Sequence, residues 1–266
     1  MKTRAFTLIE LLVVIAIIAV LMAILMPSLR LVREQARSVA CQSNVRTLTL
    51  AWLMYKDEND DKLVYGQNQP PYGWAWIPDN AQSSSVERKK EYIAKGTLWS
   101  FIKNIDVYHC PSDRREKSPY HKEAYRTYSI AGGMHGGSIN GGQTAGVLPC
   151  MRYSDINGPS TKYVFLAECD IRGVNCGSWL INPKDRKWVD AFGIWHSKNR
   201  STLGYADGHA GMHRWYSEGL IKWNELALWK PTSFYFHRDP ASSNDSLEME
   251  DFESAVKGYA YRALSE

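Results

Sequence analysis

The feature that most limits the fold of this chain is an apolar run near its amino terminus. Every residue from 11 to 26 is apolar, and the apolar character extends back to Phe6. As an α-helix, residues 6–26 rise about 31 Å, which spans the hydrocarbon core of a bilayer. The run leads into Met26, Pro27 and Ser28 without the small-residue end that precedes signal-peptide cleavage. The sequence therefore predicts a membrane-spanning helix that is retained.

One carboxylate, Glu10, interrupts this segment. An ionised carboxylate deep in a bilayer costs about 3 kcal/mol, so Glu10 must either reach the headgroups or pair with a cation. The residues around it, Lys2 to Val13, closely resemble the prepilin cleavage and methylation motif of type IV pilins and type II secretion pseudopilins. This resemblance favours a paired Glu10 over one that only reaches the headgroups.

The resemblance implies that residues 1–5 are a leader peptide. A prepilin peptidase would cut between Ala5 and Phe6 and methylate the new amine of Phe6, and Glu10 would pair with that amine on a neighbouring subunit. The chain departs from the family at Ala5, where a glycine is usual.

Membrane orientation also follows from the resemblance, because basic residues flank both ends of the span. The expected protein is a single-pass protein of the cytoplasmic (inner) membrane with a cytoplasmic amino terminus. Its head would be periplasmic or extracellular.

Residues 27–56 are expected to carry the helix into the head. Within them, apolar residues recur at alternating spacings of four and three, which places them on one helical face. These residues are Cys41, Val45, Leu48, Trp52 and Tyr55. We interpret them as a core stripe and not as a cofactor site.

A globular head is expected at 57–239. It opens on an acidic stretch, 57–61, that resembles a calcium loop but has Lys62 at the glycine position and Asn68 at the position of the final glutamate, so a solvated helix end is favoured. A helix is expected at 86–102 and a glycine-rich loop at 132–142. Strand-like runs at 125–130, 162–166, 192–195, 202–206 and 209–215 predict a small antiparallel sheet.

Composition narrows the class of partner. The hydrophobic fraction of 44% is typical of a folded domain, and the net charge of +4 is spread along the chain without a dense basic run. A nucleic-acid partner is therefore not expected.

The five cysteines include no Cys-x-x-Cys pair, so no metal site is expected from them. Cys169 and Cys176 are equally compatible with a disulfide or with buried thiols.

Late in the chain, Asp207 and Gly208 lie between two strand-like runs and predict a type I′ hairpin turn. With His196 upstream, they resemble the His-x9-Asp-Gly signature of a large pilin-like family, as do residues 110–113 and 158–168. Here ten residues separate His196 from Asp207.

His196, Asp207, His209 and His213 invite a metal or catalytic interpretation, and so does the adjacent pair His109 and Cys110. The sequence supplies no nucleophile with an oriented base, so structural roles are favoured. No enzyme, no cofactor and no metal is expected.

Residues 240–266 form a tail with a helix expected at 247–264, either for a partner or for docking on the head. Together these patterns predict an α+β, pilin-like fold: a long N-terminal helix, membrane-spanning in its first half, packed on a small antiparallel sheet. The expected function is that of a structural subunit, a pilin or pseudopilin, which assembles with copies of itself or other pilin-like subunits. The alternative is a surface-displayed adhesin or carbohydrate-binding protein that uses its tryptophans and tyrosines, with the same anchor.

Overall fold

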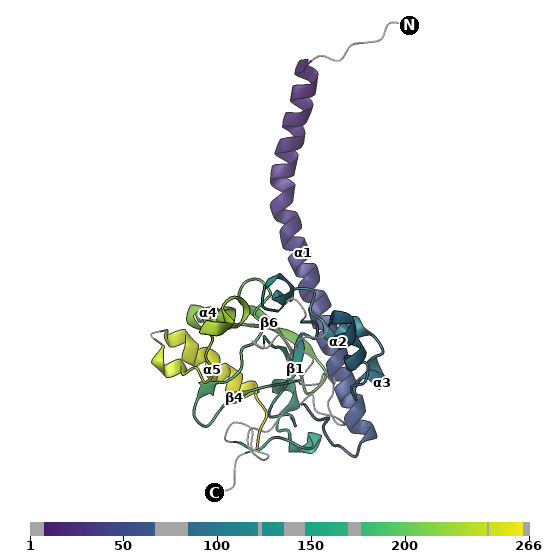
Figure 1. The fold of residues 1–266 in the computed structure, drawn as a ribbon, viewed down its shortest axis with the longest axis vertical. Helices are drawn as coiled ribbons and strands as arrows, with labels where there is room; N and C mark the ends of the chain where they lie inside the picture. The colour runs from purple at the N-terminus through teal and green to yellow at the C-terminus, as the bar shows by residue number, and fades with distance from the viewer. Residues whose placement is uncertain are drawn as a thin grey trace.

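A long helix projects from a compact head in the computed structural model (Figure 1). The structure describes residues 8–66, 85–121, 124–135, 147–169, 177–243 and 245–262. Helix α1 (Leu8–Glu58) contains 51 residues and continues past Pro27 into the head. This confirms the long N-terminal helix predicted from the apolar run and the stripe that follows it.

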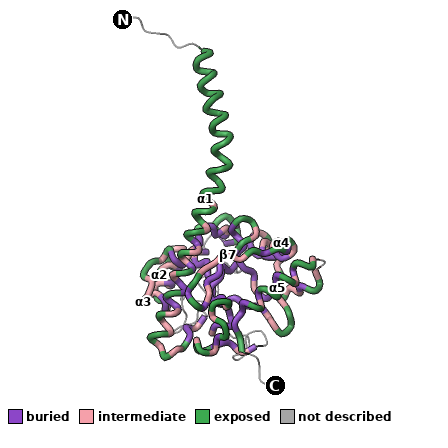
Figure 2. The backbone as a smooth tube through the Cα atoms, turned by 180° about the vertical axis from the view of Figure 1, so that it is seen from behind, coloured by how far each residue is buried: buried purple, intermediate pink, exposed green. Residues whose placement is uncertain are grey.

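Helix α1 has two parts that differ in burial (Figure 2). Residues 8–40, which we call the stem, contain no buried residue, whereas burial begins at Cys41. Cys41, Val45, Leu48 and Trp52 are each at most 1% exposed, and Tyr55 is partly buried. The predicted core stripe is therefore confirmed, since the face with spacings of four and three is the face that packs on the head.

The head is built around a five-stranded sheet with the order β3-β1-β2-β6-β7. Its strands are β1 (Tyr128–Ala131), β2 (Tyr163–Ala167), β3 (Ser178–Trp179), β6 (Arg200–Tyr205) and β7 (Ala210–Arg214). All neighbouring pairs are antiparallel except β1 and β3, which are parallel. A separate antiparallel pair consists of β4 (Ile181–Asn182) and β5 (Lys187–Trp188). The predicted α+β class is confirmed, and the parallel edge strand β3 is an addition.

Four of the five predicted strand runs correspond to β1, β2, β6 and β7. The fifth, 192–195, is no strand: it is buried and makes a single antiparallel bridge between Phe192 and Glu168. A short apolar run of this kind is buried from all sides, so its composition does not distinguish a strand from packed irregular backbone.

Helices cover the outside of the head. The predicted helix 86–102 is divided into α2 (Val86–Ile93) and α3 (Trp99–Ile102), with Gly96 donating its N–H to the Ile93 carbonyl between them. Near the C-terminus lie α4 (Glu218–Trp229) and α5 (Ser246–Gly258). Short 3-10 helices connect these elements: η2 (Ile105–Tyr108), η3 (Arg115–Lys117), η4 (Tyr153–Asp155), η5 (Pro159–Thr161), η6 (Pro231–Ser233) and η7 (Pro240–Ser242).

Helix α5 packs on the head through buried Phe252 and Ala255, and the Ala255 carbonyl accepts a hydrogen bond of 2.7 Å from the Tyr163 hydroxyl. Of the two roles considered for the tail, the structure thus displays docking on the head.

Aromatic side chains fill much of the core. Trp188 contacts Phe252 with ring centroids 5.1 Å apart, and Phe192 contacts Trp215 at 4.7 Å. Offset and edge-to-face pairs of this kind add to the stabilisation from burial. None of the eight tryptophans in the described residues is exposed: Trp52, Trp99, Trp179, Trp188, Trp195, Trp215, Trp223 and Trp229. Packing accounts for their abundance.

Candidate functional site

The stem presents a long apolar surface to its surroundings. Its side chains are exposed along the whole membrane-length segment, for example Leu8 at 78% and Ile24 at 69%. Among the described residues, α1 is the one helix long and apolar enough to cross a membrane. A soluble protein rarely exposes a contiguous apolar surface of this extent, so the stem requires lipid or neighbouring apolar helices.

Glu10 lies in the first turn of α1 and is exposed on the stem. A carboxylate in this position interacts favourably with the helix macrodipole. Ala5 and Phe6 lie outside the described residues, so leader cleavage and methylation at these positions stay predictions. So does the pairing of Glu10 with a neighbouring subunit.

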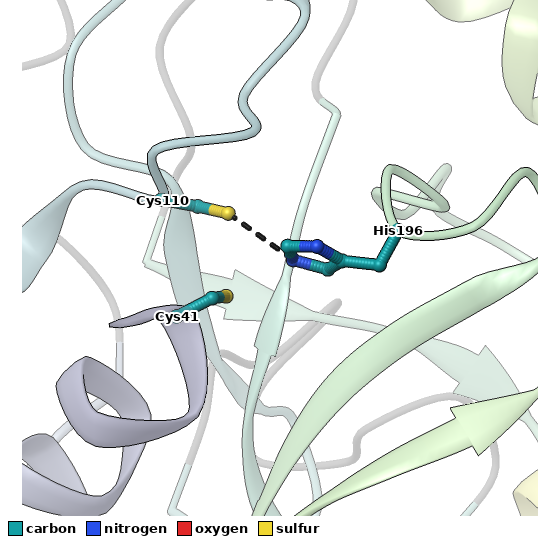
Figure 3. Close-up of side chains that lie close together, drawn as sticks. All are labelled: Cys41, Cys110 and His196. Atoms are coloured by element: carbon teal, nitrogen blue, oxygen red, sulfur yellow. Dashed lines mark hydrogen bonds between the residues drawn. The ribbon is translucent and has the colours of Figure 1, made fainter. Parts of the chain in front are cut away.

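Where the stem enters the head, three side chains from distant segments meet (Figure 3). Cys41 comes from α1, Cys110 from the loop after η2, and His196 from the turn before β6. All three are at most 2% exposed, and one donor atom from each lies within 4.8 Å of the others. His196 Nε2 is 3.4 Å from Cys110 Sγ. We call these three residues the Cys-His cluster.

Each member of the cluster has polar support. His196 Nδ1, the ring nitrogen turned away from Cys110, lies 3.1 Å from Ser38 Oγ and 3.3 Å from Glu34 Oε1. The Tyr128 hydroxyl oxygen is 3.1 Å from Cys41 Sγ. The backbone N–H of Ser112 donates to Cys110 Sγ at 3.4 Å. The cluster is therefore held from several sides.

The loop that carries Cys110 is fixed by a buried hydrogen-bond chain. The Cys110 N–H donates to Thr127 Oγ1 at 2.9 Å, and this hydroxyl donates to Asp113 Oδ2 at 2.7 Å. Asp113 forms an ion pair with Arg115 at 2.7 Å, with both side chains 1% exposed. Residues 110–113 are among those that resemble the pilin-like family. In the structure, the contacts of Asp113 within this segment hold the loop that positions Cys110.

The pKa values of the buried thiols are shifted in opposite directions. Burial opposes the thiolate of Cys41, but hydrogen bonds from Cys110 and His196 hold the pKa of Cys41 well below its usual value. Burial and the neighbouring Cys41 raise the pKa of Cys110 well above its usual value. Burial lowers the pKa of His196, yet Cys41 and Glu34 more than offset this and raise it. At Cys150, outside the cluster, burial raises the pKa to about 11.

The structure does not bring His196 together with Asp207 and Gly208. They lie beyond opposite ends of β6, a six-residue strand about 20 Å long. Asp207 Oδ1 instead accepts a hydrogen bond from the His209 backbone N–H at 3.2 Å and lies 2.6 Å from His209 Nδ1. The three motif residues therefore do not form one site.

The hairpin at Asp207 and Gly208 is confirmed, but the type I′ turn is wrong. That turn requires positive φ at both residues, and here only Gly208 has it, at 98°. The strands pair through Tyr205 and His209, so the loop has three residues, 206–208, with glycine in the last position. Such loops place one left-handed residue before the second strand, a position that glycine occupies without steric cost.

His209 and His213 line one cavity of about 300 Å³, together with Tyr163 and Lys257. Neither belongs to a group of donors close enough to hold a metal ion: within the described ranges, the only such group of His, Cys, Asp or Glu is the Cys-His cluster. His109, although adjacent to Cys110 in sequence, turns its Nδ1 to the Tyr125 carbonyl oxygen at 2.7 Å. Structural roles fit all three histidines.

Sequence reasoning missed the Cys-His cluster. It tested cysteine spacing along the chain, and none of the three members is close to another in sequence. Each member did carry a separate signal: Cys41 in the core stripe, Cys110 in the motif at 110–113, and His196 in the late motif. For the disulfide considered earlier, Cys169 is buried and Cys176 lies outside the described residues, so that pairing stays a prediction.

Comparison with known proteins gives one match. Residues 1–26 match the family model described as the prokaryotic N-terminal methylation motif. No curated protein and no solved structure matches the chain. The match covers the segment that precedes and forms the apolar part of the stem, and it does not extend into the head.

Proposed function

We propose that this chain, which carries a prepilin-type N-terminal methylation motif on a long apolar helix, is a structural pilin-like subunit of a type IV pilus-like or type II secretion system. A prepilin peptidase processes it, and it assembles through its stem with copies of itself or with other pilin-like subunits. The observation that carries the proposal is the apolar part of the stem, residues 8–26, which lies within the matched segment and is exposed along its whole length.

The stem explains how one segment serves both anchoring and assembly. Before assembly, its apolar side chains are covered by lipid in the inner membrane. In an assembly, the same side chains pack against neighbouring stems, which again removes them from water. The head then lies on the periplasmic or extracellular side.

In this scheme, Glu10 determines the longitudinal offset between neighbouring stems. Cleavage before Phe6 creates a cationic amine four residues from Glu10, and pairing with a neighbour's amine compensates the cost of burying the carboxylate. An unpaired carboxylate among apolar side chains is unfavourable, so one longitudinal offset between neighbouring stems is preferred.

The test is the mature amino terminus. The full chain is expressed with and without an active prepilin peptidase, and its N-terminal peptide is identified by mass spectrometry. The proposal predicts N-methylated Phe6 only with the active peptidase. An amino terminus at Met1 in both strains contradicts it.

A role as a displayed binding protein has less support. It rested on tryptophans and tyrosines. The tryptophans of the described residues are packed into the head, whereas Tyr120, Tyr216, Tyr235 and Tyr261 are exposed and are the side chains left for such a role. The methylation motif likewise supports a structural role.

A further inference from the structure

We propose that the Cys-His cluster, Cys41, Cys110 and His196, is a binding site for a thiophilic d10 cation, Zn²⁺ or Cu⁺, which ties α1 to the loop after η2 and to the turn before β6. The inference stands apart from the proposed assembly function, because it rests on three side chains outside the methylation motif.

The donor geometry suits such an ion. Metal–sulfur bonds of about 2.3 Å and metal–nitrogen bonds of about 2.0 Å place neighbouring donors about 3.5–4 Å apart. Cys110 Sγ and His196 Nε2 are 3.4 Å apart, and all three donor atoms lie within 4.8 Å of one another. Shifts of about 1 Å or less therefore bring them around one ion.

Donor chemistry selects the class of cation. Two thiolates and an imidazole are soft or borderline ligands, which Zn²⁺ and Cu⁺ prefer and Mg²⁺ and Ca²⁺ do not. For Zn²⁺, the two thiolates balance the charge of the ion. For Cu⁺, the three protein donors are already a sufficient number of ligands. Both ions share the chemistry of the site, and the experiment below distinguishes them.

The surroundings resemble the outer shell of a metal site. Histidine ligands almost always pass their second ring N–H to a carboxylate, a carbonyl or water. With His196 Nε2 facing the sulfurs, its Nδ1–H faces Ser38 Oγ at 3.1 Å and the carboxylate of Glu34 at 3.3 Å. The Tyr128 hydroxyl and the Ser112 N–H are placed to donate to the two sulfurs.

A Cys41–Cys110 disulfide is the competing outcome in an oxidising compartment. It uses the two sulfurs alone and gives no role to the inward-facing His196 Nε2 or to the carboxylate behind the ring. A cation uses all three donors and these supports, so the geometry favours metal over disulfide.

The principal experiment measures metal in the full chain. The protein is extracted from membranes in detergent without chelators, with thiols protected from air, and its Zn and Cu contents are measured by mass spectrometry of the elements. We expect about one Zn or Cu per chain. Cys41→Ser, Cys110→Ser and His196→Gln should each lose it. The matched control is Cys150→Ser, which alters a buried cysteine outside the cluster and should retain the metal.

Three results overturn the proposal. One is the absence of Zn and Cu from the isolated protein, combined with no uptake when Zn²⁺ or Cu⁺ is titrated into it. Another is retention of the metal by all three cluster variants. The last is recovery of a Cys41–Cys110 linked peptide after thiols are alkylated in intact cells.

A second test uses a residue outside the buried core, so that it remains informative if the substitutions of Cys41, Cys110 and His196 prevent folding. Glu34 is 30% exposed in its side chain, so Glu34→Gln should fold while it weakens the support of His196. The affinity for the cation, measured by competition with a chromophoric chelator, should fall about 10- to 100-fold. Glu58→Gln, at the exposed end of α1, should leave it unchanged. Equal affinities for wild type and Glu34→Gln contradict the assigned support.

Discussion

Gly204 of β6 lies directly against Thr49 of α1. A Cβ placed on Gly204 would lie 2.4 Å from Thr49 Oγ1 and 2.6 Å from Val45 Cγ1, distances that real Cβ atoms do not show. The buried part of α1 thus approaches the sheet as closely as the backbone of β6 permits. Any side chain at position 204 separates the two.

Gly204→Ala should destabilise the head by about 1–3 kcal/mol, because the added methyl group overpacks the contact between α1 and β6. Thermal unfolding of the full chain in detergent, followed by circular dichroism, checks this. Gly211→Ala in β7 is the matched control, since its Cβ would meet Tyr205 at an ordinary 3.7 Å. Equal melting temperatures for the two variants would show that the contact is not tight.

Asp113→Asn should cost about 3 kcal/mol or more. It leaves the Arg115 guanidinium buried without its carboxylate, which is strongly unfavourable. The same unfolding measurement applies. Glu225→Gln removes the partner of the more exposed ion pair with Arg114 and should cost less than about 1 kcal/mol. A loss of similar size in both variants would contradict the role given to burial.

Glu10→Leu should leave processing and membrane insertion intact but abolish most self-association. Leucine suits the bilayer better than a carboxylate and provides no partner for a neighbour's amine. Copurification of two differently tagged copies from membranes measures association, with Ile9→Leu as the control. Undiminished copurification of Glu10→Leu would remove Glu10 from the assembly mechanism.

His213 should make the head less stable in mild acid. Burial lowers the pKa of His213, so the unfolded chain takes up a proton at a higher pH than the folded chain. Its stabilising contribution is complete above the unfolded pKa of about 6.5 and is lost as pH falls through the folded value. His213→Phe, which retains an aromatic ring against Trp215, should reduce the loss of melting temperature between about pH 8 and about pH 5.

Met212→Leu, one position earlier in β7, provides the comparison for His213. It changes a side chain that does not titrate, so its effect on the melting temperature should be similar at both pH values. If His213→Phe also shifts both values equally, the pH dependence arises elsewhere.

The long N-terminal helix α1 could be predicted because local patterns determine it. An apolar run of membrane length and a stripe at alternating spacings specify a helix without knowledge of the rest of the chain. By contrast, β3, β4 and β5 have two residues each, too few to show any periodicity. Tertiary contacts form these strands, so the sequence around them gives no signal.

The candidate site illustrates the same limit. The Asp207 and Gly208 pair predicted a hairpin correctly, yet the loop gained one residue because Ala206 joined the turn. The Cys-His cluster depends on three segments that only the complete fold brings together. Its donors were visible one by one, but their proximity is a property of the sheet and of α1 packed on it.

The exposed stem also acts as a lever arm. From Leu8 to Cys41 it is about 50 Å long, so a tilt of about 10° where α1 enters the head displaces its tip by about 9 Å. Packed helices lie 8–10 Å apart, so that displacement equals the width of one neighbour. In the proposed assembly, the angle at the base would therefore decide whether neighbouring stems meet in register, and the close contact at Gly204 restricts that angle.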